Sequence, residues 1–205
     1  MIYLVRHGES IANTKGIYQG QTYDTGLSAL GKLQAKALAK YLVRTGLDRI
    51  VCSPLKRTRQ TAEIVSNFTK IKLEIDRDII ETNHGFWEGF HKDHIAKSWP
   101  QLYSNWFINP SQIAFPGGES FLQTQVRVIN WWEKIKEEKQ NILVVSHDNI
   151  LRIIIAYILK MGLDDIWKFY LYPTAITVIE SNKLVCLNDK NHLMGIDVDL
   201  STHAL

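Results

Sequence analysis

The chain lacks the features that mark secreted, membrane-spanning or nucleic-acid-binding proteins. Its 205 residues include two cysteines, Cys52 and Cys186, too few for a disulfide framework and typical of free thiols in a reducing compartment. The longest apolar run, residues 153–159, is too short to span a bilayer. The net charge of +3 is small for this length, so it favours neither a nucleic acid nor an acidic membrane surface as a partner.

The start of the chain shows no secretory signal. Met1 leads directly into a short apolar stretch, without a basic segment or a long apolar core. We therefore expect a cytoplasmic protein. The length suits one domain with a substantial core, and no repeat, low-complexity tract or linker divides residues 1–205.

Short apolar stretches alternate with amphipathic stretches along most of the chain. This alternation predicts an α/β fold, a three-layer sandwich with a mostly parallel central sheet and helices on both faces. An aromatic-rich helical stretch interrupted by prolines predicts a small helical cap over about residues 90–118. Strands are predicted at residues 2–5, 50–52, 72–75, 143–146, 175–179 and 184–187. Helices are predicted at residues 28–44, 55–68, 92–107, 119–139 and 149–161, with Ser28 as an N-cap.

Three of the predicted strands end in basic or imidazole side chains. The first strand leads to Arg6 and His7, and the strand at residues 143–146 leads to His147. The strand at residues 50–52 precedes a helix that carries Arg57 among other basic residues. In parallel sheets, ligands bind beyond the carboxyl ends of the strands. Guanidinium forks suit phosphate and imidazole can act as a nucleophile, so these strand ends predict one anion pocket.

Four motifs in this order resemble those of the histidine phosphatase superfamily, also called the phosphoglycerate mutase-like family. They match the family's spacing and cover almost the whole chain. Each motif is short, but four in register are specific. Within the superfamily the chain looks most like the compact, broad-specificity phosphatases. The motifs are residues 6–10 (RHGES), 53–63 (SPLKRTRQTAE), 81–89 (ETNHGFWEG) and 144–147 (VVSH).

The resemblance implies phosphoryl transfer through a phosphohistidine, with His7 as the nucleophile. Arg6, Arg57 and His147 would neutralise the charge of the phosphate, as phosphoryl transfer requires. Glu81 would protonate the leaving alkoxide and then deprotonate the water that opens the phosphohistidine. This double duty suits a carboxyl group with a raised pKa.

Neutral groups complete the predicted site. Asn13, Gln19 and the backbone near Gly8 are expected to bind the substrate, although Gln19 could instead end a turn. The implied chemistry needs neither a metal nor a cofactor. His91 and His94 are three residues apart, a spacing compatible with a shared metal, but no third ligand lies close in the sequence.

Several charged residues near the motifs have open roles. Asp148 departs from the glycine-rich continuation common at this point in the family. It could orient the preceding imidazole or cap the next helix, and we favour the cap. Glu9 is expected to support Arg6 or a nearby backbone amide. Glu88 could be a surface carboxylate or part of the site, and His203 is expected at the surface.

The predicted cap bears on the choice of substrate. Residues 98–125 contain no lysine or arginine, but they contain aromatic residues that include Trp106 and Phe107. A mutase acting on phosphoglycerate needs further cations for the substrate carboxylate. An uncharged aromatic cap instead suits an apolar or aromatic leaving group, with Trp106 and Phe107 as substrate-binding residues. These aromatics could equally form the cap's own core.

We therefore expect a metal-independent phosphomonoester hydrolase of broad specificity acting on small molecules. Three alternatives stay open: a cofactor-dependent phosphoglycerate mutase, a ribazole phosphate phosphatase, and a catalytically weak phosphate-binding regulatory module. A homodimer that uses an apolar surface around the terminal hairpin also stays open.

Overall fold

A computed structural model describes residues 1–196 and residue 203. These residues form a six-stranded sheet in the order β3-β2-β4-β1-β5-β6. Neighbouring strands among β1 to β4 are parallel, whereas β5 and β6 pair antiparallel. The mostly parallel sheet confirms the predicted α/β fold. The strands are β1 (Ile2–Arg6), β2 (Arg49–Cys52), β3 (Leu73–Ile75), β4 (Ile142–Ser146), β5 (Ile176–Glu180) and β6 (Lys183–Asp189).

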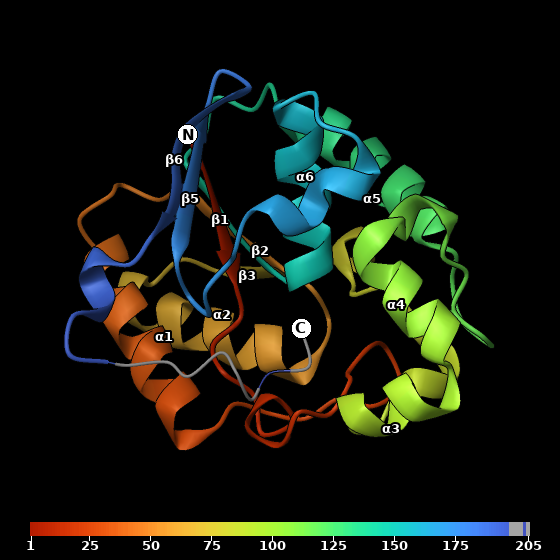
Figure 1. Cartoon of the computed structure of the whole chain (residues 1–205). Coiled ribbons are helices and arrows are strands. Elements are labelled where there is room, and N and C mark those ends of the chain that lie inside the picture. Colours follow the sequence, from red (N-terminus) through yellow and green to blue (C-terminus); the bar gives the residue numbers. More distant parts are fainter. Residues whose placement is uncertain (197–202, 204–205) are drawn as a thin grey trace.

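Helices cover both faces of this sheet (Figure 1). Successive side chains of a strand point to opposite faces. Tyr3 and Val5 of β1 accordingly pack in a cluster with α1 and α2, while Ile2 and Leu4 pack in a cluster with α5 and α6. The three-layer arrangement is therefore as predicted. The helices are α1 (Ala29–Leu42), α2 (Lys56–Thr69), α3 (Lys92–Ser98), α4 (Pro100–Ile108), α5 (Phe121–Ile135) and α6 (Asp148–Ile158).

Local sequence signals explain where the helices begin. The hydroxyl of Ser28 accepts a hydrogen bond from the backbone N–H of Gly31, which confirms Ser28 as the N-cap of α1. The helix predicted over residues 92–107 is divided into α3 and α4, because Pro100 disfavours the helical conformation for Trp99. None of the helices in the described part of the chain has the length and apolar composition to cross a membrane.

The stretch predicted as a cap contains α3 and α4, which lie at one side of the fold (Figure 1). Its aromatic side chains pack mainly on one another. The buried ring of Trp106 makes edge-to-face contacts with Phe115, Phe121 and Trp167, with ring centroids 4.7–5.1 Å apart. This cluster joins the stretch to α5 and to the segment that follows α6.

The carboxyl ends of β1, β2 and β4 lie side by side. The backbone N–H of His7 donates to the carbonyl of Ser146, and that of Ser53 donates to the carbonyl of Val145. Residues 6–7, 53 and 146–147, which are far apart in sequence, are thereby brought to one edge of the sheet, as the sequence predicts.

Candidate active site

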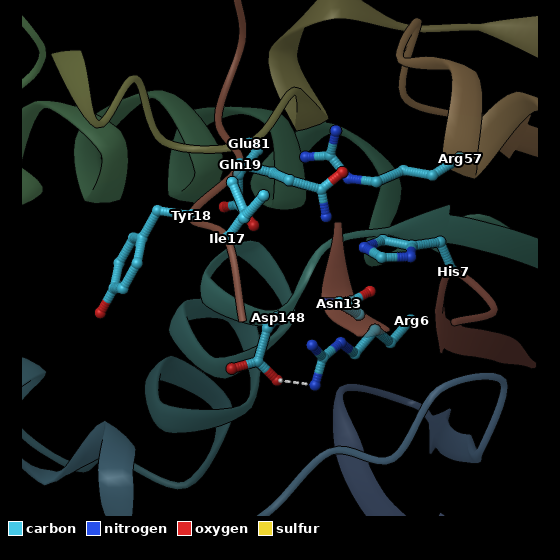
Figure 2. A pocket seen from close by; sticks show the side chains of 9 residues that line it. All are labelled: Arg6, His7, Asn13, Ile17, Tyr18, Gln19, Arg57, Glu81 and Asp148. Carbon is cyan, nitrogen blue, oxygen red and sulfur yellow. Dashed lines mark hydrogen bonds and ion pairs between the residues drawn. The ribbon is translucent and has the colours of Figure 1, made fainter. Parts of the chain in front are cut away.

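A small cavity of about 20 Å³ lies beside the carboxyl end of β1 (Figure 2). More than half of its lining side chains are charged or ionisable, although most of them are buried. Burying several charges in so small a volume is costly unless they have partners or a charged ligand. The lining residues are Arg6, His7, Asn13, Ile17, Tyr18, Gln19, Arg57, Glu81 and Asp148.

The ring of His7 holds a nitrogen lone pair available to this cavity. Nδ1 of His7 lies 2.7 Å from the carbonyl oxygen of Gly8. A carbonyl oxygen can only accept, so Nδ1 carries the proton and Nε2 keeps its lone pair. Burial, and then the guanidinium groups of Arg57 and Arg6, hold the pKa of His7 well below its usual value. His7 is therefore neutral at neutral pH, as a nucleophile must be.

Arg57 of α2 extends its guanidinium group past the ring of His7 and into the cavity (Figure 2). The side chain is 1% exposed. Nη1 donates to the carboxylate of Asp24 at 2.9 Å, and Nη2 donates to the carbonyl of Gly20 at 3.2 Å. Nε is buried and has no hydrogen-bond partner within residues 1–196 and 203. A buried donor without a partner costs about 1–3 kcal/mol, which an oxygen atom of a bound anion would recover.

Arg6 approaches the cavity from the opposite side to Arg57 (Figure 2). Its Nη1 forms an ion pair of 3.2 Å with Asp148 and a hydrogen bond of 2.9 Å to the carbonyl of Leu171. These contacts hold the guanidinium group in place. Two fixed cations therefore flank His7, which is the arrangement that binding a phosphate requires.

His147 follows β4 and lies beside His7, with the two ring centroids 5.4 Å apart. The ring of His147 is fully buried. Nε2 of His147 lies 2.7 Å from the hydroxyl of Ser53, and Nδ1 has no partner among the described residues. Burial, with Arg57 next, holds the pKa of His147 well below its usual value, so without a ligand this imidazole is neutral.

Glu81 is the carboxyl group of the cavity that can hold a proton at neutral pH. Burial raises the pKa of Glu81 to about 7, against the lowering effect of Arg57 and of a hydrogen bond from the backbone N–H of Thr82. A group with this pKa is half protonated near neutrality. It can therefore give a proton in one step and take one in the next.

Asp148 differs from Glu81 in its partners, and the prediction that Asp148 caps the next helix is wrong. The residue at the N-cap of α6 is His147, and Asp148 is the first residue inside the helix. Its carboxylate binds Arg6 at 3.2 Å and Arg152 at 2.6 Å. Although burial opposes it, the two guanidinium groups hold the pKa of Asp148 below its usual value. Asp148 therefore stays ionised, which leaves Glu81 as the proton donor.

The neutral residues predicted to bind the substrate form hydrogen bonds with other residues of the protein. Gln19 lines the cavity, but its amide is engaged by Ser10 and Thr25. Asn13 lines the cavity with Oδ1 bound to Ser10, which leaves its amide N–H groups as donors. The backbone N–H of Gly8 donates to the hydroxyl oxygen of Thr61 at 3.1 Å. Gly8 thus acts through its carbonyl, which orients His7, rather than as a donor to the substrate.

The two aromatic residues predicted to bind the substrate, Trp106 and Phe107, lie in different environments. Trp106 is completely buried in the aromatic cluster, so it presents no surface to a substrate and is placed wrongly by the sequence interpretation. Phe107, the next residue on α4, is 41% exposed and lines a second cavity of about 250 Å³. This second cavity adjoins the first, because Arg6 lines both.

Glu9 and His203 lie elsewhere than predicted. Glu9 does not bind Arg6; its carboxylate accepts the hydroxyl proton of Ser28 at 2.5 Å, and so supports the N-cap of α1. His203 is not at the surface. It is 6% exposed, lies 3.6 Å from the carboxylate of Glu9, and lines the 250 Å³ cavity.

Glu88 is not a surface carboxylate but the anchor of a loop. Its two carboxylate oxygen atoms accept hydrogen bonds of 2.7–3.1 Å from four backbone N–H groups. This fixes the segment that carries Gln19 into the cavity wall. The N–H donors belong to Gln21, Thr22, Tyr23 and His84.

The histidine pair three residues apart has ordinary structural roles. Nδ1 of His91 accepts the N–H of Asp93 at the start of α3, and His94 stacks on Phe90. Within residues 1–196 and 203, no group of three or more His, Cys, Asp or Glu side chains could hold a metal ion.

Other residues at the site were missed by the sequence interpretation. Ser53 and Thr61 fall inside a quoted motif, and a polar residue directly after a buried strand could have singled out Ser53. Arg152 follows Asp148 by four residues on α6, and this i,i+4 spacing could have predicted their ion pair. Asp24, the partner of Arg57, carries no local signal, because the two residues are 33 positions apart.

Comparisons with known proteins agree with this geometry. The model of the histidine phosphatase superfamily (branch 1) matches residues 2–186. The chain is 35% identical to phosphoserine phosphatase 1 of Hydrogenobacter thermophilus, over 94% of this chain and 93% of that protein. It is 33% identical to adenosylcobalamin/alpha-ribazole phosphatase of Escherichia coli K12, over 89% and 90%. The structure of YhfR from Bacillus stearothermophilus superposes with a TM-score of 0.87, at 29% identity, over 94% and 98%.

An α/β fold with two imidazoles and two guanidinium groups at one sheet edge defines a phosphoryl-transfer enzyme. The chain belongs to the histidine phosphatase superfamily. The protein is a phosphatase of that superfamily.

Proposed function

We propose that the protein hydrolyses small phosphomonoesters of broad structure, without a metal, through a phosphohistidine on His7. The observation that carries this proposal is the buried Nε of Arg57, a donor without a partner among the described residues, beside the neutral His7. The phosphoryl group would supply the missing acceptor while the Nε2 lone pair of His7 attacks phosphorus.

In the first step, a bond forms between Nε2 of His7 and phosphorus as the ester P–O bond breaks. The leaving oxygen takes the proton held by Glu81, and the alcohol departs. Arg6 and Arg57 stabilise the charge on the phosphoryl oxygens. The unsatisfied Nδ1 of His147 joins them as a donor when its Nε2 accepts the hydroxyl proton of Ser53.

In the second step, water attacks phosphorus and the P–N bond breaks. Glu81, now a carboxylate, takes the proton of the water, and inorganic phosphate and neutral His7 are regenerated. The pKa of about 7 lets Glu81 serve both steps at neutral pH. The guanidinium groups supply the positive charge that a metal ion provides in other phosphatases.

Broad specificity has support from the comparisons. The similar proteins are named for phosphoserine and for ribazole phosphate, two esters whose alcohol portions differ greatly in size. We propose that the chain acts in the cytoplasm on small-molecule esters, as one domain with residues 90–118 as its cap, without a nucleic-acid or membrane partner. Its two free cysteines support a reducing compartment. A homodimer stays a prediction; the edge strand β6 exposes Val185 and Leu187.

Steady-state hydrolysis of p-nitrophenyl phosphate in the presence of EDTA tests this proposal. We expect fast release from the aryl ester, and a rapid quench during turnover should trap a phosphoryl group on the peptide that contains His7. Turnover without a trapped phosphohistidine, or turnover abolished by EDTA, would contradict the mechanism.

The same assay separates the alternatives. A phosphoglycerate mutase would interconvert 2- and 3-phosphoglycerate in the presence of a bisphosphate primer and release little phosphate. A regulatory module would bind phosphate esters without turning over any of them. A dedicated ribazole phosphate phosphatase would hydrolyse that ester far faster than the others.

A further inference from the structure

Glu88 is joined to Arg57 through a single peptide group, the one between Gly20 and Gln21. The N–H of this group, on Gln21, donates to Oε1 of Glu88 at 3.0 Å. Its C=O, on Gly20, accepts a hydrogen bond of 3.2 Å from Nη2 of Arg57. A trans peptide group is planar and its N–H and C=O point in opposite directions, so fixing the N–H also fixes the C=O. The carboxylate of Glu88 therefore sets the direction of a carbonyl that binds Arg57.

Five donors of the described part of the chain converge on the carboxylate of Glu88. Four are backbone N–H groups and one is the hydroxyl of Thr22, at distances of 2.6–3.1 Å. Although burial opposes it, hydrogen bonds from Thr22, Tyr23 and Gln21 hold the pKa of Glu88 below its usual value. The carboxylate is therefore ionised at neutral pH, and an ionised carboxylate can only accept hydrogen bonds.

The backbone before this peptide group also lies close to Glu88. A Cβ atom at Gly20 would lie 2.0 Å from Oε1 of Glu88 and 3.0 Å from the carbonyl oxygen of Thr82. Nδ1 of His84 lies 2.7 Å from the carbonyl oxygen of Gln19 and donates to it, because that oxygen can only accept. Glu88 in turn accepts the backbone N–H of His84 at 3.1 Å. Two consecutive carbonyl groups are thus fixed from the side of Glu88.

The other end of this loop supplies the second partner of Arg57. Oδ1 of Asp24 accepts from Nη1 of Arg57 at 2.9 Å, and its Oδ2 accepts the backbone N–H of Lys56 at 2.7 Å. Asp24 directly follows the three residues whose N–H groups bind Glu88. Both acceptors of the guanidinium group within the described part of the chain therefore belong to residues 20–24. A shift of this loop would turn Nε of Arg57 away from the phosphoryl group.

We propose that Glu88 is a positioning residue for phosphoryl transfer, which aims the guanidinium group of Arg57 at the phosphate by holding residues 20–24. This inference rests on the proposed phosphatase mechanism. A displacement of about 1 Å in a catalytic group can cost roughly 100-fold in rate. Because Arg57 acts on the phosphoryl group, the loss of Glu88 affects all esters alike, whatever their leaving group.

Glu88→Gln tests this proposal with orthovanadate, an inhibitor that resembles the transferring phosphoryl group. The amide keeps the shape of the side chain but replaces one acceptor oxygen with a donor, which then faces N–H groups of the loop. We expect the inhibition constant of orthovanadate to rise, and kcat/KM to fall, by about 10- to 100-fold. The fall should be equal for p-nitrophenyl phosphate and for an alkyl phosphate. An unchanged inhibition constant in the folded variant would overturn the proposal.

A double-mutant cycle shows whether Glu88 acts through Arg57. When Arg57→Ala is already present, adding Glu88→Gln should lower kcat/KM for p-nitrophenyl phosphate by less than about 3-fold, because the group that Glu88 positions is gone. The full loss in that background would overturn the proposal, since the effect would then not need the guanidinium group.

Asp48→Asn is the matched control. Asp48 also accepts a backbone N–H, that of Asn141 at 2.8 Å, but it precedes β2 and so lies at the opposite edge of the sheet. This variant should leave the inhibition constant of orthovanadate unchanged. If Glu88→Gln fails to fold, Glu88→Asp replaces it: the charge stays but is withdrawn by one methylene, and the inhibition constant should again rise. An unchanged constant in Glu88→Asp would overturn the proposal, whereas no hydrolysis of p-nitrophenyl phosphate by the unmodified protein would contradict the phosphatase mechanism itself.

Discussion

The Nδ1 nitrogen of His7 lies 2.7 Å from the carbonyl oxygen of the next residue, Gly8. This short-range hydrogen bond decides the tautomer of the ring and leaves Nε2 unprotonated toward the cavity. The orientation of the nucleophile is thus set by the turn that directly follows β1. Gly8 therefore contributes to the site through its carbonyl, although its own N–H donates to Thr61.

Replacing His7 with Ala should abolish turnover without unfolding the protein. The substitution removes the nitrogen that attacks phosphorus, whereas the hydrogen bond from the backbone N–H of residue 7 to Ser146 remains. Steady-state hydrolysis of p-nitrophenyl phosphate and a thermal unfolding curve check both statements. Substantial turnover by a folded His7→Ala protein would show that another group is the nucleophile.

Replacing Glu81 with Gln should slow esters according to their leaving group. An alkoxide needs a proton as it departs, so alkyl phosphates should slow by roughly 100- to 10,000-fold, the usual range for general acid catalysis. p-Nitrophenolate departs without a proton, so the aryl ester should slow far less. Glu63→Gln, at an exposed carboxylate, serves as the control. Equal slowing of both classes would remove Glu81 from the acid role.

The pH profile should show one limb near pH 7 that belongs to Glu81. The acid is active when protonated and burial raises its pKa to about 7, so kcat/KM for an alkyl phosphate should fall as pH rises through about 7. The pKa of His7 is lowered, so this nucleophile loses its neutral form only at pH values below the usual range of histidine. The limb near pH 7 should disappear in Glu81→Gln. Its persistence would assign it to another group.

Replacing Asp148 with Asn should destabilise the protein markedly. The change leaves two buried guanidinium groups, on Arg6 and Arg152, without their shared carboxylate. Removing one partner of a buried ion pair costs about 3 kcal/mol, or roughly 6–12 °C in Tm for a chain of this size. Asp165→Asn, which breaks a more exposed pair with Lys168, should lower Tm far less. Equal Tm values for the two variants would contradict this role of Asp148.

Replacing Gly8 with Ala should reduce both stability and activity. A Cβ atom at Gly8 would lie 2.6 Å from the carbonyl oxygen of Gly31, a backbone atom that cannot move aside alone. The displaced turn would also move the carbonyl that orients His7. We expect a loss of about 1–3 kcal/mol in unfolding free energy and a lower kcat. Gly162→Ala, where the nearest atom is 3.6 Å away, should change neither; an unperturbed Gly8→Ala would refute the packing argument.

Features that depend on neighbouring residues were predictable from the sequence. Apolar stretches ending in Arg6, His7 and His147 predict strands whose ends meet at one sheet edge, because parallel strands bring their carboxyl ends together. Ser28 predicts the start of α1, since an N-cap hydrogen bond spans only three residues. Pro100 could have predicted the break between α3 and α4 for the same local reason.

The amino-acid sequence alone predicts the architecture and the set of groups at the strand ends, because hydrophobic periodicity and short-range hydrogen bonds belong to each segment alone. The tertiary structure decided which groups face one another. Asp148 pairs with Arg6 across 142 positions of the chain, and Trp106 is buried while its neighbour Phe107 lines a cavity. Arg152 lines the same cavity from α6 rather than from the predicted cap. Such contacts depend on how distant segments pack, which no local pattern records.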